Sequence, residues 1–304
     1  MIKSKWVNRN EGIFNEFDKD IKSFDAKLKA LAYSTTHQVK MKMSWKNFNE
    51  MIGLPKHPVT LEPQPLMKYQ NDWQETVWKV RSRWKKYHVK KGRQMGFTDV
   101  MMRIFAFGGF DYYMGKKVLN VAGTREKTAK KNHAKLRYLF NNIENQIADN
   151  GTDLYFKLKN GTEYEALPAN GAVRGDSKIA AIGLDEAAHF KIVDDFPILN
   201  AFVPIAESNE SDFFLWSTPN GKARMFYHLD EGDLSNNDYF KVSFPLPLTE
   251  GGLYTKEKIA EMLNKKDVDV AQEYLCQYTT VRDAIFMKEF DEDPSLIAED
   301  YSLI

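Results

Sequence analysis

The stretch from Lys178 to Glu186, with the sequence KIAAIGLDE, joins an apolar run to two adjacent acids. The unbroken apolar residues predict a strand that is covered on both faces, as the strands of parallel sheets are. Burial does not explain Asp185 and Glu186, which fall where open α/β sheets place their ligands, at the carboxyl end of a strand. An Asp that holds Mg²⁺ through its water shell and a Glu that polarises an attacking water suit that place. Because many strands end in acids, this interpretation depends on finding a phosphate loop elsewhere in the chain.

The bulk composition is that of an ordinary globular protein. Of the 304 residues, 43% are hydrophobic and 28% are charged, with a net charge of +1. A chain of this length can form one large domain or two smaller ones, with enough apolar residues for a hydrophobic core. The single cysteine, Cys276, excludes an internal disulfide, favours a reducing compartment, and is expected to fill a buried position. Without a signal-peptide pattern or an apolar stretch of membrane-spanning length, we expect a soluble intracellular protein with no membrane partner.

The positive charges gather in two segments. Residues 79–93 and 125–137 are basic, whereas residues 289–300 are acidic. Such runs are commonly solvated surface. Beside a phosphate site they become candidates for contacts with a nucleic-acid backbone.

The chain divides into three regions by composition. The sequence of residues 1–60 predicts a small region of polar helices. A cluster of prolines marks the end of this region. Residues 61–245 alternate short apolar runs with helical segments, and this alternation predicts an α/β core with a mainly parallel sheet flanked by helices. Residues 246–304 predict a helical lid or linker. Within the core we expect a strand at 118–122, a long basic helix at 124–143, a hairpin within 154–167 and a strand at 213–216.

A glycine loop precedes one of the predicted helices. The segment from Lys90 to Thr98, KKGRQMGFT, lies between a short strand candidate at 87–89 and a helical pattern at 99–107. Strand, glycine loop and helix form the context in which backbone N–H groups bind phosphate. Phe97 takes the place of the usual phosphate-loop lysine before the hydroxyl of Thr98. Since such a loop brings its two ends together, Lys91 at its start, or Lys90, can still reach the phosphates; the alternative is a basic surface turn.

A third element follows another predicted strand. Ser217-Thr218-Pro219-Asn220-Gly221 sets small hydroxyl and amide groups where they can detect a γ-phosphate. The same sequence also makes a good turn. A chance occurrence of the glycine loop, the acidic pair and this segment in this order is much less expected than a chance occurrence of any one of them.

Together these motifs resemble the ATPase portion of large terminase subunits, the DNA-packaging motors of tailed double-stranded DNA viruses. The features that carry the resemblance span about residues 61–285 and include GRQMG with Thr98, LDEAA from Leu184 and WSTPNG from Trp216. The resemblance implies a RecA-like ATPase fold that binds ATP and Mg²⁺. It also implies roles for individual residues. Gln70 would contact the adenine, Thr98 and Asp185 would hold Mg²⁺, Glu186 would be the base on water, and Arg174 would reach a neighbouring subunit's nucleotide. The remaining nucleotide-binding residues would be Lys91, Gly92, Arg93, Gln94, Met95, Gly96, Phe97, Thr98, Ser217, Thr218 and Asn220.

The resemblance further implies partners and a setting. These are double-stranded DNA, a portal protein, a small terminase subunit and a homo-oligomeric ring in the cytoplasm of an infected host cell, although the isolated portion can be a monomer. Large terminases continue into a metal-dependent nuclease, and we expect no nuclease activity from this chain because its acids near 291–293 form no separated cluster. Each of two residues also has an interpretation without a functional role: Gln70 as a glutamine on the surface of a helix, and Arg174 as an ordinary loop arginine. His189 is expected to be a packed or polar neighbour of the site, and a zinc site is not expected.

Two other functions fit part of the sequence. A helicase-like or remodelling translocase needs a second RecA-like domain, for which about 60 residues after Pro245 leave too little room. A docking module that binds nucleotide or DNA without efficient turnover becomes conceivable because Phe97 occupies the lysine place.

Overall fold

A single eight-stranded sheet organises the chain, with the strand order β3-β4-β5-β2-β6-β7-β1-β8. The computed structural model describes residues 44–57, 62–124, 128–143, 146–169, 177–191 and 194–279. From β5 to β8 all neighbouring strands are parallel, and β3, β4 and β5 pair antiparallel at one end. The expected α/β fold with a mainly parallel sheet is therefore confirmed. The strands are β1 (Lys86–Lys91), β2 (Lys117–Ala122), β3 (Ile147–Thr152), β4 (Tyr155–Leu158), β5 (Glu163–Pro168), β6 (Ile179–Asp185), β7 (Asp212–Ser217) and β8 (Tyr239–Phe244).

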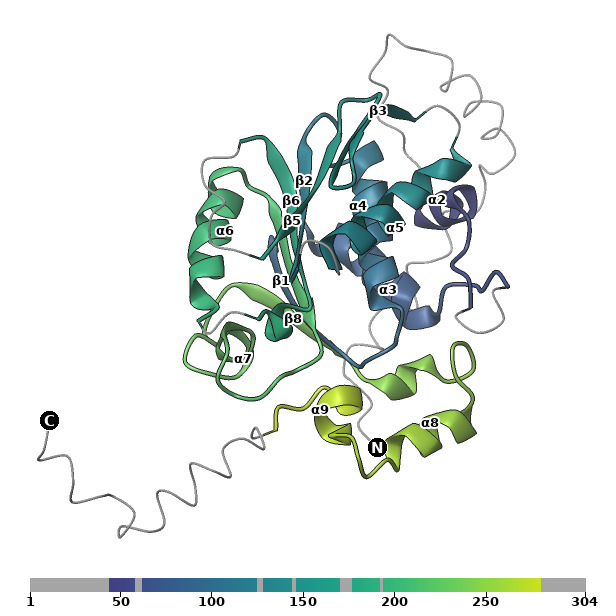
Figure 1. Cartoon of the computed structure of the whole chain (residues 1–304), viewed down its shortest axis with the longest axis vertical. Helices are drawn as coiled ribbons and strands as arrows, with labels where there is room; N and C mark the ends of the chain where they lie inside the picture. The colour runs from purple at the N-terminus through teal and green to yellow at the C-terminus, as the bar shows by residue number, and fades with distance from the viewer. Residues whose placement is uncertain are drawn as a thin grey trace, which may run out of the picture.

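Helices cover both faces of this sheet (Figure 1). One face carries α2 (Trp45–Ile52), α3 (Lys68–Val80), α4 (Phe97–Phe110) and α5 (Lys130–Leu139), and the other carries α6 (Phe196–Ser208) and α7 (Met225–Asp230). Two further helices, α8 (Lys256–Leu263) and α9 (Val270–Leu275), lie beyond one end of the sheet. Short 3₁₀ turns occupy Phe140–Asn142, Ala187–His189 and Leu246–Thr249.

The core has two apolar layers because the central strands are buried on both faces. All seven residues of β6 and all six of β7 are buried, as the unbroken apolar runs predict. Phe214 and Trp216 of β7 pack in the layer below α2 to α5, whereas Phe213 and Leu215 pack in the layer below α6 and α7. Alternate residues of one strand thus supply opposite layers.

The predicted segments differ from the structure in a few places. The strands expected at 118–122 and 213–216 and the hairpin around Asn160-Gly161 are present. The helix expected at 124–143 is shorter: α5 begins at Lys130, and residues 125–127 lie outside the described part. Strand β3 was not predicted, because the polar sequence IADNGT pairs only at the sheet edge and needs no apolar pattern there.

The regions at the two ends of the chain are described only in part. Residues 1–43 and 280–304 lie outside the described residues, so the three predicted regions remain predictions. The region expected to be a lid or linker, residues 246–304, contains α8 and α9. Cys276 is buried as expected, at the end of α9, where its thiol donates to the Phe244 carbonyl at 3.3 Å. None of the helices in the described segments is both long and apolar enough to cross a lipid bilayer.

Candidate active site

The three sequence elements meet at one edge of the sheet. Strand β7 lies between β1 and β6, so the glycine loop, the acidic pair and the Ser217–Gly221 segment leave neighbouring strands at their carboxyl ends. Open α/β sheets place ligands at this edge. Chain segments more than 90 residues apart thus contribute to one site, as the Lys91–Glu186 contact described below shows.

The glycine loop offers a row of backbone donors. It runs from Gly92 to Gly96, and Gly96, which immediately precedes α4, has a φ of 69°, a conformation that favours glycine. Gln94 also has a positive φ, of 59°. Among the described residues, no acceptor is recorded for the N–H groups of residues 94–98. Consecutive free N–H groups at a helix start are suited to binding an anion.

The two lysines at the end of β1 point to opposite faces. Lys91 is buried, and its Nζ donates to Glu186 Oε1 at 2.5 Å and to Thr218 Oγ1 at 3.0 Å. Lys90 instead pairs with Asp230 at 2.8 Å and with Glu231 at 2.9 Å, beside α7. Lys91 therefore lies in the site, and Lys90 lies outside it.

Phe97 belongs to the core rather than to the loop. Its side chain is 2% exposed, and its ring lies 5.4 Å from that of Phe244 and 6.5 Å from that of Trp73. Met95, also in the loop, is likewise buried. The position of the usual lysine is thus filled by an aromatic ring that packs α4 onto the sheet.

Asp185 receives a hydrogen bond on each carboxylate oxygen. Thr98 Oγ1 donates to Oδ1 at 3.3 Å, and the Asn132 amide of α5 donates to Oδ2. Burial raises the pKa of Asp185 to about 6, and the Glu186 carboxylate adds to this rise. Thr98 and Asp185, predicted to share a metal, are in direct contact.

Glu186 adopts a left-handed conformation that side chains rarely take, with a φ of 54°. This turn directs its carboxylate toward Lys91, while Oε2 accepts from the Ser217 hydroxyl at 3.2 Å and from the Thr218 N–H at 3.3 Å. Burial alone would raise the pKa of Glu186, but the Lys91 ammonium and the Thr218 amide outweigh it and hold that pKa below its usual range. The group is an anion in a strained position, as residues at functional sites commonly are.

The segment after β7 connects to the turn that follows the acids. The Ala188 N–H donates to Ser217 Oγ at 3.2 Å, and Asn220 Nδ2 donates to the Ala188 carbonyl at 2.9 Å. Together with Thr218, which touches Lys91, this segment contacts both other parts of the site.

Helix α9 contacts the loop and this segment together. The Arg93 N–H donates to the Glu273 carbonyl at 2.7 Å, and its guanidinium pairs with the Glu273 carboxylate at 2.9 Å. The neighbouring Gln272 accepts from the Gly221 N–H at 2.8 Å. These two α9 residues thus link two parts of the site that sequence motifs identify separately.

Gln70 lies against the loop. It is 7% exposed, its Oε1 accepts from the Met67 N–H at 2.9 Å, and its Nε2 donates to the Met95 carbonyl at 3.4 Å. The alternative interpretation of Gln70 as a surface glutamine is wrong, because the side chain is buried. Contact with an adenine remains a prediction.

Three contributors to the site were missed by sequence reasoning, and one predicted residue is not described. Asn132, Gln272 and Glu273 belong to helices without motifs, and only the fold brings them to the edge. Arg174 falls within residues 170–176, which lie outside the described part of the chain, so its role stays a prediction.

The residues present fit a hard cation that is held partly by other ligands. Thr98 and Asp185 offer oxygen atoms, which Mg²⁺ prefers, and Mg²⁺ is usually bound through one or two carboxylates together with phosphates and water. Within the described segments no group of three or more His, Cys, Asp or Glu could hold a metal ion.

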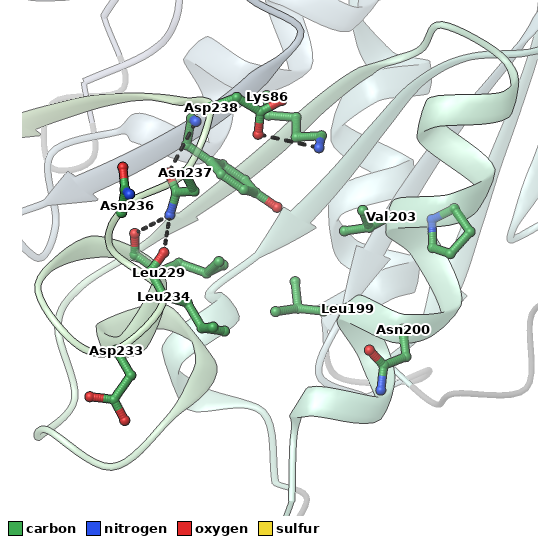
Figure 2. A pocket seen from close by; sticks show the side chains of 12 residues that line it. Lys86, Leu199, Asn200, Val203, Leu229, Asp233, Leu234, Asn236, Asn237 and Asp238 are labelled. Atoms are coloured by element: carbon green, nitrogen blue, oxygen red, sulfur yellow. Dashed lines mark hydrogen bonds and ion pairs between the residues drawn. The ribbon is translucent and has the colours of Figure 1, made fainter.

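A separate hollow lies at the opposite edge of the sheet. It has a volume of about 450 Å³ and is bordered by Lys86 and Tyr239, which begin β1 and β8. Figure 2 shows Leu199 and Val203 of α6 facing Leu229 and Leu234 across it. Because it borders the amino ends of these strands, it is distinct from the site above.

Comparisons with known proteins identify the fold. No protein-family model and no curated protein matches the sequence. Among solved structures, the large terminase ATPase domain of Thermus phage P74-26 matches with a TM-score of 0.51 and 18% identity, over 68% of this chain and 92% of that chain. The large terminase of bacteriophage HK97 matches with a TM-score of 0.59 and 15% identity, over 77% and 55% respectively. The large terminase of a thermophilic bacteriophage, in complex with ADP, matches with a TM-score of 0.58 and 14% identity, over 70% of this chain and 54% of that chain.

The matches define what is shared. The chain spans about half the length of the HK97 terminase and of the ADP-bound terminase, but nearly all of the P74-26 ATPase domain. At such low identity the likeness concerns the fold. The protein therefore has the RecA-like fold of large terminase ATPase domains.

Proposed function

We propose that this protein is a Mg²⁺-dependent ATPase that drives the translocation of double-stranded viral DNA into a procapsid, as the motor portion of a large terminase. The observation that carries the proposal is the convergence of a free phosphate loop, Lys91, the Thr98–Asp185 pair and Glu186 at one sheet edge. The fold shared with terminase ATPase domains supports it, and so does the ADP complex of one of the matching terminases.

Each group in the site has a chemical task in this proposal. The N–H groups from Gln94 to Thr98 bind phosphate oxygens, and Lys91 offsets negative charge on the β- and γ-phosphates. Mg²⁺, held by Thr98 and Asp185, would supply charge that the phosphates need as the γ-phosphoryl group leaves. Glu186 orients the attacking water and accepts its proton, a role consistent with its ionised state.

The remaining predicted residues position the nucleotide or report on it. Gln70 lies beside the loop and contacts the adenine. Ser217, Thr218 and Asn220 transmit the presence of the γ-phosphate to the turn after Glu186. Arg174 acts on the nucleotide of a neighbouring subunit in a ring that encloses DNA in the host cytoplasm, together with a portal protein and a small terminase subunit.

Replacement of Glu186 by Gln tests the catalytic assignment. The change keeps the size of the side chain but removes the base, so ATP hydrolysis should stop while binding of Mg²⁺–ATP persists. Hydrolysis is measured by phosphate release, and binding by titration with a fluorescent ATP analogue. Wild-type turnover in Glu186→Gln would disprove the assignment.

The ATPase assay, with and without duplex DNA, also separates this proposal from the docking alternative. A motor hydrolyses ATP and responds to DNA, whereas a module that only binds nucleotide or DNA shows no turnover. Light scattering of the protein with nucleotide and DNA then tests for the ring.

A further inference from the structure

Asn132 is a buried amide that touches the site from α5. Its side chain is 6% exposed, and Nδ2 donates a hydrogen bond to Asp185 Oδ2. It lies in the sequence KKNHAK, which contains no motif associated with nucleotide chemistry. None of the catalytic tasks proposed above uses this contact.

The contact makes the two oxygens of Asp185 unequal. Oδ1 accepts from Thr98 at 3.3 Å, and Thr98 is the second residue of α4, next to the phosphate loop. Oδ2 is held instead by a helix that packs on α4 and takes no part in that loop. A cation beside Thr98 is thus offered Oδ1, while the amide occupies Oδ2.

One available oxygen suits Mg²⁺ better than Ca²⁺. Mg²⁺ demands near-octahedral geometry and binds through few protein oxygens, whereas Ca²⁺ accepts six to eight oxygens and readily takes both oxygens of a carboxylate. Partners of metal ligands also fix the orientation of the ligand, and their loss typically lowers metal affinity or activity by about 10- to 100-fold.

We propose that Asn132 is a positioning residue that restricts Asp185 to a single metal-facing oxygen and thereby favours Mg²⁺ over Ca²⁺. The proposal rests on the function proposed above and concerns metal selectivity at the same site. It assigns a task to α5: the helix links the metal-facing carboxylate to the layer of helices on that side of the sheet.

A structural role for the amide is the competing explanation, and Asn49 provides a matched control. Asn49 is 3% exposed, donates to the Trp45 carbonyl at 3.0 Å and accepts from Arg103 at 3.0 Å. It is a buried, hydrogen-bonded asparagine on α2, away from Asp185. If burial of an amide were all that mattered, Asn49→Ala and Asn132→Ala would behave alike.

The experiment titrates a fluorescent ATP analogue into the full chain in Mg²⁺, in Ca²⁺ and in EDTA. Asn132→Ala should weaken the Mg²⁺-supported affinity by about 10- to 100-fold. Its affinity in Ca²⁺ should fall less, and its affinity in EDTA should match that of the wild type. Asn132→Gln, which retains an amide donor, should recover part of the preference for Mg²⁺. Thermal unfolding of each variant shows whether the fold is retained.

The outcomes separate the possibilities. An unchanged ratio of Mg²⁺ to Ca²⁺ affinity in Asn132→Ala, or an equal change in Asn49→Ala, overturns the assignment of Asn132 alone. Failure of the wild type to bind the analogue with any metal overturns the proposed function and this inference together.

Discussion

The Lys91 ammonium and the Glu186 carboxylate form an ion pair of 2.5 Å across β7, the strand that separates β1 from β6. Thr218, which follows β7, touches both groups through its hydroxyl and its N–H. The lysine expected at the phosphates and the acid expected on water therefore hold each other. In the proposed mechanism, a phosphate that draws Lys91 away would release Glu186 for its water, and this contact would then join nucleotide binding to activation.

Replacement of Lys91 by Ala should abolish most of the activity. Loss of one charge-stabilising donor in a site of this kind costs about 100- to 1,000-fold in turnover. Lys90→Ala is the matched control, since Lys90 pairs with Asp230 and Glu231 beside α7, and it should retain the wild-type rate. Steady-state ATPase kinetics compare the two variants. Equal losses in both would contradict the separation of their roles.

Metal binding should depend on pH through Asp185. Burial raises its pKa to about 6, so a proton competes with Mg²⁺ below that pH, and Mg²⁺ affinity should fall by roughly tenfold per pH unit. Titration of Mg²⁺ between pH 4 and 8, about two units on either side of that pKa, measures the effect. Asp185→Asn should bind Mg²⁺ weakly without this dependence. A profile in the wild type that is flat across pH 6 would contradict the prediction.

The same carboxyl should affect stability in the opposite direction. The folded-state pKa of Asp185 lies above the unfolded value of 3.8. The protonated carboxyl therefore stabilises the fold at pH values below 3.8, and this contribution is lost as the pH rises through about 6. Asp185→Asn lacks this loss. Between pH 3.8 and about 6, its free energy of unfolding should therefore rise relative to that of the wild type. Urea unfolding at a series of pH values gives the comparison. A constant difference across the range would argue against a buried, ionisable Asp185.

Placing a lysine at position 97 should destabilise the protein. Phe97 is buried among Trp73 and Phe244, and removal of a buried Phe ring typically costs about 3–5 kcal/mol. Phe97→Lys should lower the free energy of unfolding by at least this amount, because the ammonium would also lack a partner. Phe97→Leu should cost less. Chemical unfolding measures both, and a Phe97→Lys variant as stable as the wild type would show that the ring is not part of the core.

Hydrogen exchange should show that α9 and the Ser217–Gly221 segment open together. Gln272 accepts from the Gly221 N–H, and loss of that acceptor leaves a partly buried donor unpaired, at about 1–3 kcal/mol. Gln272→Ala should therefore speed exchange in both segments. Glu261→Gln on α8, which removes only the pair with Lys258, should not. Faster exchange in α9 alone would show that the two segments open independently.

Much of the fold follows from local sequence. The apolar runs of β6 and β7 identify buried parallel strands because both of their faces need cover, and the hairpin around Asn160-Gly161 follows from its turn residues. Strand β3 could not be found this way, since an edge strand with polar residues has no apolar period.

The site was predictable only where chemistry follows a strand directly. The acids Asp185 and Glu186 lie at the end of β6, the loop glycines follow β1, and the Ser217–Gly221 segment follows β7. The parallel sheet brings these three strand ends together. Asn132, Gln272 and Glu273 reach the site through packing of whole helices, which no local pattern encodes. Which of Lys90 and Lys91 enters the site depends on how β1 is oriented in the sheet. The burial of Phe97 depends on the aromatic residues that pack around its ring in the folded protein.

The alternation along β1 limits which positions of this strand can direct a lysine into the site. Val89 packs in the layer below α4, and Lys91 enters the site on the same side of the strand, whereas His88 and Lys90 face α7. Within β1, a lysine can therefore enter the site only from every second position. By the same alternation, deletion of one residue within β1 would turn Lys91 toward α7 and leave Gly92 at the position that enters the site.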